Sequence, residues 1–186
     1  DFEVVEKYSS IVSDLLNDLH IGAKVAWLGQ KHPSSNEDKF LYDSVMSGVH
    51  TQLEHDFYDL NNENIEGYDL VLGLRVLYLC DSRKKLVSNL TKICKSNKKV
   101  VFDFMTGNPV LMDGRETFTK KNNSQTILPF FPELYDAQFY VQSNHEDQIV
   151  TLSDLSESGI RVDNILTFRD GVKRRFYTLC EVHSDT

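Results

Sequence analysis

The amino-acid sequence predicts a single three-layer α/β domain, in which helices cover both faces of a mostly parallel sheet that ends in an antiparallel hairpin. Three observations support this prediction. Apolar runs alternate with amphipathic segments between residues 4 and 105, as in α/β folds. The run YDLVLG, residues 68–73, is almost continuously apolar, as parallel strands covered on both faces are. The pair Asp170-Gly171 separates two apolar runs near the end of the chain and indicates a tight hairpin turn.

Helical periodicity identifies the helices. Apolar residues recur at three- and four-residue steps in the first segment of the chain and again before KKVVFDF, which gives each segment one apolar face. Gly22 ends the first helix, and Ser35 or Asn36 caps the second. TLSDLSES, closed by Gly159, predicts a short further helix. The predicted helices cover residues 4–19, the segment from the cap to Met46, residues 83–96 and residues 151–158.

Short apolar runs bounded by glycine or polar loops predict the strands. They cover residues 24–28, 51–56, 68–73, 99–105, 162–168 and 174–182. The segment from about 106 to 147 is different, because it is rich in Gly, Pro and aromatic residues. We expect a long loop there with one or two strands, QTILPFF and AQFYVQS, as an aromatic-rich insertion within one domain spanning residues 1–186.

Composition and charge limit the classes of function. The net charge of −8 argues against a broad nucleic-acid surface, which needs an excess of Lys and Arg. No apolar run approaches the roughly 20 residues that span a bilayer, and no signal peptide is visible, so we expect a cytoplasmic protein. No His, Cys and Asp cluster has metal-ligand spacing, so no metal site is predicted. Cys80, Cys94 and Cys180 lie in apolar surroundings and are interpreted as buried free thiols.

The order of these elements resembles the Rossmann-like S-adenosylmethionine (SAM) dependent methyltransferases. The resemblance rests on YDLVLGLRVLYL at 68–79, on the following helix with KKVVFDF, and on LSDLSESGIRVDNILTF at 152–168. The family has an aromatic-Asp strand motif at the first of these places, and later a helix that ends in glycine before a final hairpin. The resemblance implies SAM as the cofactor, bound at the carboxyl ends of the strands.

The resemblance also implies which residues hold the cofactor. The family's first strand runs into G-x-G-x-G, where glycines let the backbone approach the methionine part of SAM. Here the loop reads Gly29-Gln30-Lys31-His32-Pro33, so only Gly29 matches, and Gly29 and Gln30 are the predicted contacts. Gly73 and Leu74, after the YDLVLG strand, fall where the family lines its cofactor.

Two acidic positions complete the family's pattern. In LEHDFYDL, Asp56 matches the residue that contacts the adenine amino group, with Phe57 as a packing neighbour. The acid that ends the second strand and holds the ribose hydroxyls has no clear match, and Asp43 is a poor candidate. Only about 20 residues separate the first strand from LEHDFYDL, so either one strand is missing or the unit is contracted.

The candidate catalytic residues are His145 and Arg75. His145 precedes the helix expected at 151 and is a candidate general base for an acceptor hydroxyl. Arg75 cannot act as a base, but it could bind a carboxylate or phosphate through two hydrogen bonds. Further candidate bases are His32, His55, Asp103 and Asp113.

Three functions stay open at this level. The first is a SAM-dependent methyltransferase acting on a small molecule, such as a sugar or another metabolite. The second is a methyltransferase-like module without catalysis that serves as a binding or partner domain, in a homodimer or as a partner subunit. The third is a nucleotide-dependent transferase such as a glycosyltransferase. The loop from Gly29 to Asn36 separates the first two, because it decides whether SAM binds.

Overall fold

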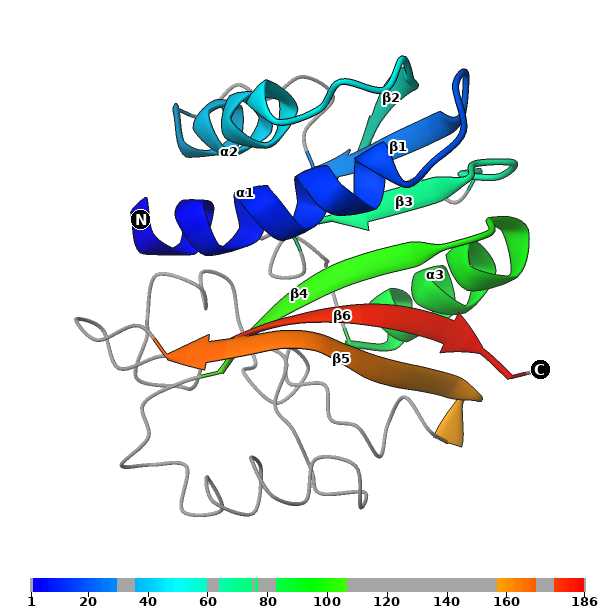
Figure 1. Ribbon diagram of the computed structural model, residues 1–186. Coiled ribbons are helices and arrows are strands. Elements are labelled where there is room, and N and C mark those ends of the chain that lie inside the picture. Colours follow the sequence, from blue (N-terminus) through cyan, green and yellow to red (C-terminus); the bar gives the residue numbers. More distant parts are fainter. Residues whose placement is uncertain are drawn as a thin grey trace.

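A computed structural model describes residues 2–29, 36–59, 64–74, 76, 83–106, 157–169 and 176–185. The described chain forms three helices and one six-stranded sheet (Figure 1). The elements are α1 (Phe2–Asn17), β1 (Lys24–Gly29), α2 (Asn36–Ser47), β2 (Glu54–Asp59), β3 (Leu70–Gly73), α3 (Arg83–Ser96), β4 (Val100–Thr106), β5 (Ile160–Arg169) and β6 (Phe176–Ser184).

The sheet has the strand order β2-β1-β3-β4-β6-β5. Strands β2, β1, β3 and β4 run parallel to their neighbours, and β6 runs antiparallel to both β4 and β5. The predicted mixed sheet with its antiparallel carboxyl-terminal strands is therefore confirmed. Residues 151–156 of the helix predicted at 151–158 lie outside the described residues, as do the turn Asp170-Gly171 and residues 107–147 of the insertion with its two predicted strands.

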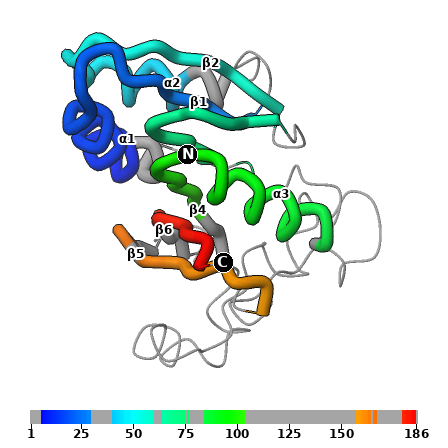
Figure 2. The backbone as a smooth tube through the Cα atoms, turned by 90° about the vertical axis from the view of Figure 1, so that its right-hand side faces the viewer, coloured from blue at the N-terminus to red at the C-terminus, as the bar shows by residue number. Residues whose placement is uncertain are grey.

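Helices cover both faces of the sheet, with α1 and α2 on one face and α3 on the other (Figure 2). Alternate residues of each strand point to opposite faces, so the side chains of one strand can pack against the helices on both faces of the sheet. In β3, Leu70 and Leu72 pack toward α1, whereas Val71 packs toward α3. All four β3 residues are buried, which explains the continuous apolar run seen in the sequence. Among the described helices, none is both long and apolar enough to cross a membrane.

A buried hydrogen bond ties α1 to the middle of the sheet. The hydroxyl of Tyr8, which is fully buried, donates to Oδ2 of Asp103 on β4 at 3.0 Å. Asp103 is 4% exposed, so its carboxyl needs hydrogen-bond donors from the protein. Asp103 lies in the middle of β4, and its position supports a structural role better than that of the general base suggested by the sequence.

Asp69, in the aromatic-Asp motif, has a structural role at the amino ends of the strands. Its Oδ2 accepts a hydrogen bond from the backbone N–H of Lys24 at 2.9 Å, and Lys98 Nζ lies 3.1 Å from Oδ1. The Lys24 bond, followed by Lys98, holds the pKa of the Asp69 carboxyl below its usual value. Asp69 therefore joins the start of β1 to the start of β3, at the edge of the sheet opposite the predicted cofactor site.

Candidate functional site

Strands β1, β2 and β3 end side by side at one edge of the sheet, where parallel α/β sheets bind ligands. Gly29, the last residue of β1, pairs with Asp59, the last residue of β2. On the other side of β1, Trp27 pairs with Leu72, so β3 ends beside the same point. The carboxyl edge of the sheet thus brings together Gly29, Asp59 and Gly73.

The backbone of Gly29 has a conformation that favours glycine. Its φ angle is +152°, which residues with a Cβ rarely adopt. A Cβ added there would lie 3.4 Å from Cγ1 of Val76, an ordinary van der Waals distance. Glycine is therefore favoured by the turn of the backbone at the end of β1, and a Cβ there would contact the buried side chain of Val76.

Asp59 is a candidate site residue that sequence reasoning missed. The sequence predicts the second strand at residues 51–56, but β2 covers Glu54–Asp59 and begins three residues later. Because β2 pairs directly with β1, it takes the second-strand position, where the resemblance expects the ribose-binding acid. Asp59 ends this strand and is exposed. Of the two sequence alternatives, a missing strand fits this direct pairing, since α2 is the one element that the described residues form between β1 and β2.

Asp56, the predicted adenine contact, lies in the middle of β2 rather than at its end. Its Oδ2 accepts a hydrogen bond from the Tyr68 hydroxyl at 2.7 Å, and the Tyr58 hydroxyl contacts the Tyr68 hydroxyl in turn. Burial, followed by the bonds to Tyr58 and Asp56, raises the pKa of Tyr68, so this hydroxyl stays protonated and donates. Asp56 is thus part of a local polar network on the α3 side of the sheet.

Phe57, the predicted packing neighbour of Asp56, points to the opposite face of β2, because consecutive strand residues alternate. Its ring packs against Tyr42 of α2, with centroids 5.2 Å apart. Tyr42 also contacts Trp27 at 5.0 Å in an edge-to-face arrangement. This aromatic cluster fixes α2 on β1 and β2 and accounts for Phe57 by packing.

His55 completes the aromatic cluster and is held neutral. Nε1 of Trp27 donates to Nδ1 of His55 at 2.9 Å, which requires this nitrogen to be deprotonated. Burial lowers the pKa of His55, and the nearby Asp56 opposes that effect only in part. His55 is the second residue of β2, far along the strand from Asp59, so its position supports a structural role rather than that of a base.

The lowered pKa of His55 predicts a loss of stability in mild acid. Below about pH 6.5, the unfolded chain binds a proton at this residue that the folded chain resists, so stability falls as the pH drops through that value. His55→Gln keeps an acceptor for Trp27 but does not titrate. We expect the melting temperature of the wild type to fall more than that of His55→Gln between about pH 8 and about pH 5.5. His20→Gln, at a residue whose side chain is 66% exposed, is the control and should follow the wild type. If the melting temperatures of the wild type and His55→Gln fell equally with pH, this would contradict a lowered pKa of His55 as the cause.

Gly73 and Leu74, the predicted lining after β3, are explained largely by packing. A Cβ on Gly73 would lie 2.2 Å from Cε1 of Phe102, so the glycine admits the Phe102 ring. Leu74 is 5% exposed, and its side chain belongs to the core cluster beneath α1. Packing therefore accounts for both residues, and neither has a side chain that is free to contact a ligand.

The remaining sequence candidates divide into two groups. Asp43 is an exposed residue of α2. Gln30, His32, Arg75, Asp113 and His145 lie outside the described residues, so their predicted roles stay predictions.

The two described cysteines are free thiols with no sign of activation. Burial raises the pKa of Cys94 to about 12. Burial, together with the charge of Asp103, raises the pKa of Cys180 as well. Neither thiol is ionised at neutral pH, so neither has the thiolate that a cysteine nucleophile needs.

Comparisons with known proteins identify the fold. No protein-family model and no curated protein sequence matches the chain. Human N-acetylserotonin methyltransferase, solved in complex with SAM, matches with a TM-score of 0.52 and 15% identity, over 98% of this chain and 53% of that one. The mitomycin 7-O-methyltransferase matches with a TM-score of 0.50 and 13% identity, over 97% of this chain and 53% of that one. The chain therefore has the Rossmann-like fold of SAM-dependent methyltransferases and spans about half the length of each of these two proteins.

Proposed function

We propose that this domain binds SAM at the carboxyl edge of β1, β2 and β3 and transfers its methyl group to a small-molecule acceptor. The observation that carries the proposal is the pairing of Gly29 with Asp59. It puts a glycine with a positive φ angle and an exposed carboxylate side by side at the strand ends of a methyltransferase fold. Neither residue by itself would support a ligand.

The chemistry of these two residues fits the two halves of SAM. A carboxylate accepts hydrogen bonds from two hydroxyls, so Asp59 suits the ribose diol. The positive φ angle of Gly29 turns the backbone at the end of β1, and the glycine turns of nucleotide-binding sites let a ligand approach the backbone in this way, so Gly29 suits the methionine part. In this arrangement, Asp59 orients the ribose and Gly29 lets the sulfonium end approach β1.

Little further chemistry is required of the protein. When bound, SAM supplies an electrophilic methyl group on its sulfonium, and the chain has to hold the acceptor in line with it. A general base is needed where the acceptor is a hydroxyl, and His145 stays the predicted residue for that role. The net charge of −8 favours an acceptor other than a nucleic acid.

A second function is that of a methyltransferase-like module without catalysis. The loss of glycines from the loop after β1 favours this alternative. After Gly29 the chain continues Gln30-Lys31-His32-Pro33, so the other glycines of the family pattern are absent. A proline at Pro33 fixes φ and limits how that loop can wrap around a ligand. In this alternative the domain acts as a partner subunit.

Calorimetric titration with SAM and with S-adenosylhomocysteine tests the proposal. We expect saturable binding of one ligand per chain and a rise in melting temperature, because a ligand that binds only the folded state stabilises it. Absence of both heat and thermal shift at about 1 mM ligand would favour the non-catalytic module. A nucleotide sugar is the comparison ligand, and tight binding of it alone would support a nucleotide-dependent transferase instead.

A further inference from the structure

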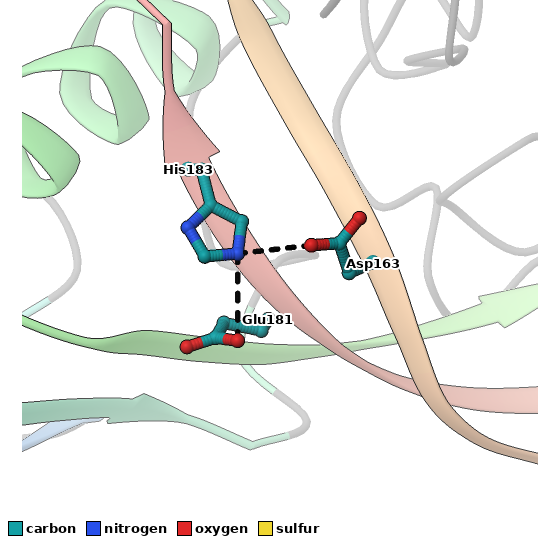
Figure 3. Close-up of side chains that lie close together, drawn as sticks. All are labelled: Asp163, Glu181 and His183. Carbon is teal, nitrogen blue, oxygen red and sulfur yellow. Dashed lines mark ion pairs between the residues drawn. The ribbon is translucent and has the colours of Figure 1, made fainter.

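A histidine and two carboxylates meet on β5 and β6, away from the proposed SAM site. They are Asp163 of β5 with Glu181 and His183 of β6 (Figure 3). Nε2 of His183 lies 3.1 Å from Oδ2 of Asp163 and 3.4 Å from Oε2 of Glu181. Glu181 pairs with Val101 near the start of β4, so the group lies toward the edge of the sheet opposite Gly29.

Strand pairing places these three side chains on one face. Asp163 of β5 is directly opposite Glu181 of β6. His183 lies two residues after Glu181 on β6 and therefore points to the same face. The intervening Val182 packs into the cluster beneath α3, so Glu181 and His183 point to the other face. Their side chains are 27% and 32% exposed, and that of Asp163 is 47% exposed, so the group is partly open to solvent.

The contacts around His183 are not those of an ordinary hydrogen bond. Nε2 is itself buried, and neither carboxylate oxygen has the geometry to accept a hydrogen bond from it. The nitrogen nevertheless faces both oxygens (Figure 3). Two carboxylates directly opposite each other on a sheet also repel, and a cation bound between them would offset this repulsion.

The distances match the ligand shell of a transition metal. Zinc binds imidazole nitrogen and carboxylate oxygen at about 2.0–2.2 Å in a tetrahedral arrangement, which separates neighbouring ligand atoms by about 3.3–3.6 Å. The two measured separations, 3.1 and 3.4 Å, are close to this range, and all three ligand atoms lie within 4.8 Å of one another.

The neighbouring basic side chains are arranged to support such a site. Lys99 Nζ lies 4.0 Å from Oε1 of Glu181, on the oxygen that does not face His183. Arg161 Nη1 lies 3.1 Å from Oδ2 and 3.4 Å from Oδ1 of Asp163, and its Nε is 3.6 Å from Asp185. An oxygen has two lone pairs, so Asp163 can accept from Arg161 and still bind an ion. Ligating carboxylates in metal sites are commonly held by such outer hydrogen bonds.

We propose that Asp163, Glu181 and His183 bind one divalent transition-metal ion of the zinc class, with water as the fourth ligand. The mixed nitrogen and oxygen ligands favour zinc or cobalt over magnesium or calcium, which prefer oxygen alone. The ion would join β5 to β6 and stabilise the carboxyl-terminal hairpin. This site is independent of SAM binding at Gly29.

Calorimetric titration of the metal-free protein with zinc chloride tests this proposal. We expect one ion per chain and binding weakened at least about ten-fold in His183→Ala and in Glu181→Gln. His20→Ala is the matched control, because His20 Nε2 lies 4.0 Å from a single carboxylate, Asp69, and this variant should bind as the wild type does. Cobalt bound to the wild type should show tetrahedral absorption bands that His183→Ala lacks.

Two results would overturn the proposal. One is the absence of saturable zinc binding by the wild-type protein. The other is binding of wild-type strength in both His183→Ala and Glu181→Gln, which would place the ion elsewhere on the chain. Circular dichroism of each variant verifies folding, and Glu181→Gln, which keeps the side-chain shape, decides the question if His183→Ala does not fold.

Discussion

Replacing Gly73 with alanine is expected to lower the free energy of unfolding by about 3 kcal/mol, the upper part of the usual range for overpacked cores. The new Cβ would lie 2.2 Å from Cε1 and 2.4 Å from Cδ1 of Phe102, distances that no packed structure tolerates. Phe102 of β4 pairs with Gly73 of β3 and is fully buried, so its ring cannot move into solvent. Urea unfolding of the wild type and of Gly73→Ala measures the loss of unfolding free energy, provided that this free energy depends equally steeply on urea concentration in both.

The same substitution in a Phe102→Leu background serves as its control. Leucine removes the ring atoms that the new methyl group would meet, so Gly73→Ala should cost less than half as much there. Such non-additivity is the signature of two side chains in direct contact. An equal loss in both backgrounds would mean that Gly73 is needed for its backbone and not for the Phe102 ring.

Replacing Asp59 with alanine is expected to weaken binding of S-adenosylhomocysteine by about ten- to a hundred-fold. Hydrogen bonds to a charged acceptor contribute about 1.5–3 kcal/mol, and this variant removes the acceptor that we propose for the ribose diol. Asp59 is exposed at the end of β2, so the melting temperature without ligand should change little. Titration calorimetry gives the affinity, and thermal unfolding gives the stability.

Asp56→Asn is the matched control for Asp59→Ala. The asparagine keeps an oxygen that can accept from Tyr68, and the residue lies three positions before the end of β2, so affinity should stay at the wild-type value. The reverse result would be that Asp56→Asn weakens the affinity and Asp59→Ala leaves it unchanged. It would identify Asp56, the residue indicated by the sequence, as the cofactor contact. It would also remove Asp59 from the site.

Local sequence signals predicted most of the elements. The helix at residues 83–96 was predicted with the bounds observed for α3, because its apolar face repeats at helical spacing. The apolar run of β3 indicated a strand covered on both faces, and all its residues are buried. The order of helices and strands then restricted the fold to a mixed α/β sheet, because parallel neighbours need a crossover between them. These features depend on residues that are close together in the chain.

The site could not be predicted in the same way, because it depends on register. The LEHDFYDL segment alternates too weakly to fix where its strand begins, and an error of three residues moved the strand end from Asp59 to Asp56. Side chains alternate along a strand, so Asp56 and Phe57, adjacent in sequence, point to opposite faces. Pairing with Gly29 is what brings Asp59 to the carboxyl edge.

The sequence by itself determined the class of fold, the positions of most helices and strands, and the glycine that ends β1. Only the tertiary structure decided which side chains meet. Asp163 and His183 are neighbours because β5 and β6 pair antiparallel, and Gly73 is a glycine because the Phe102 ring from the next strand fills its place. The periodicity of a segment indicates which of its residues are buried. The contacts described here join segments that are distant in the chain. Only the pairing of strands sets the distances between such segments.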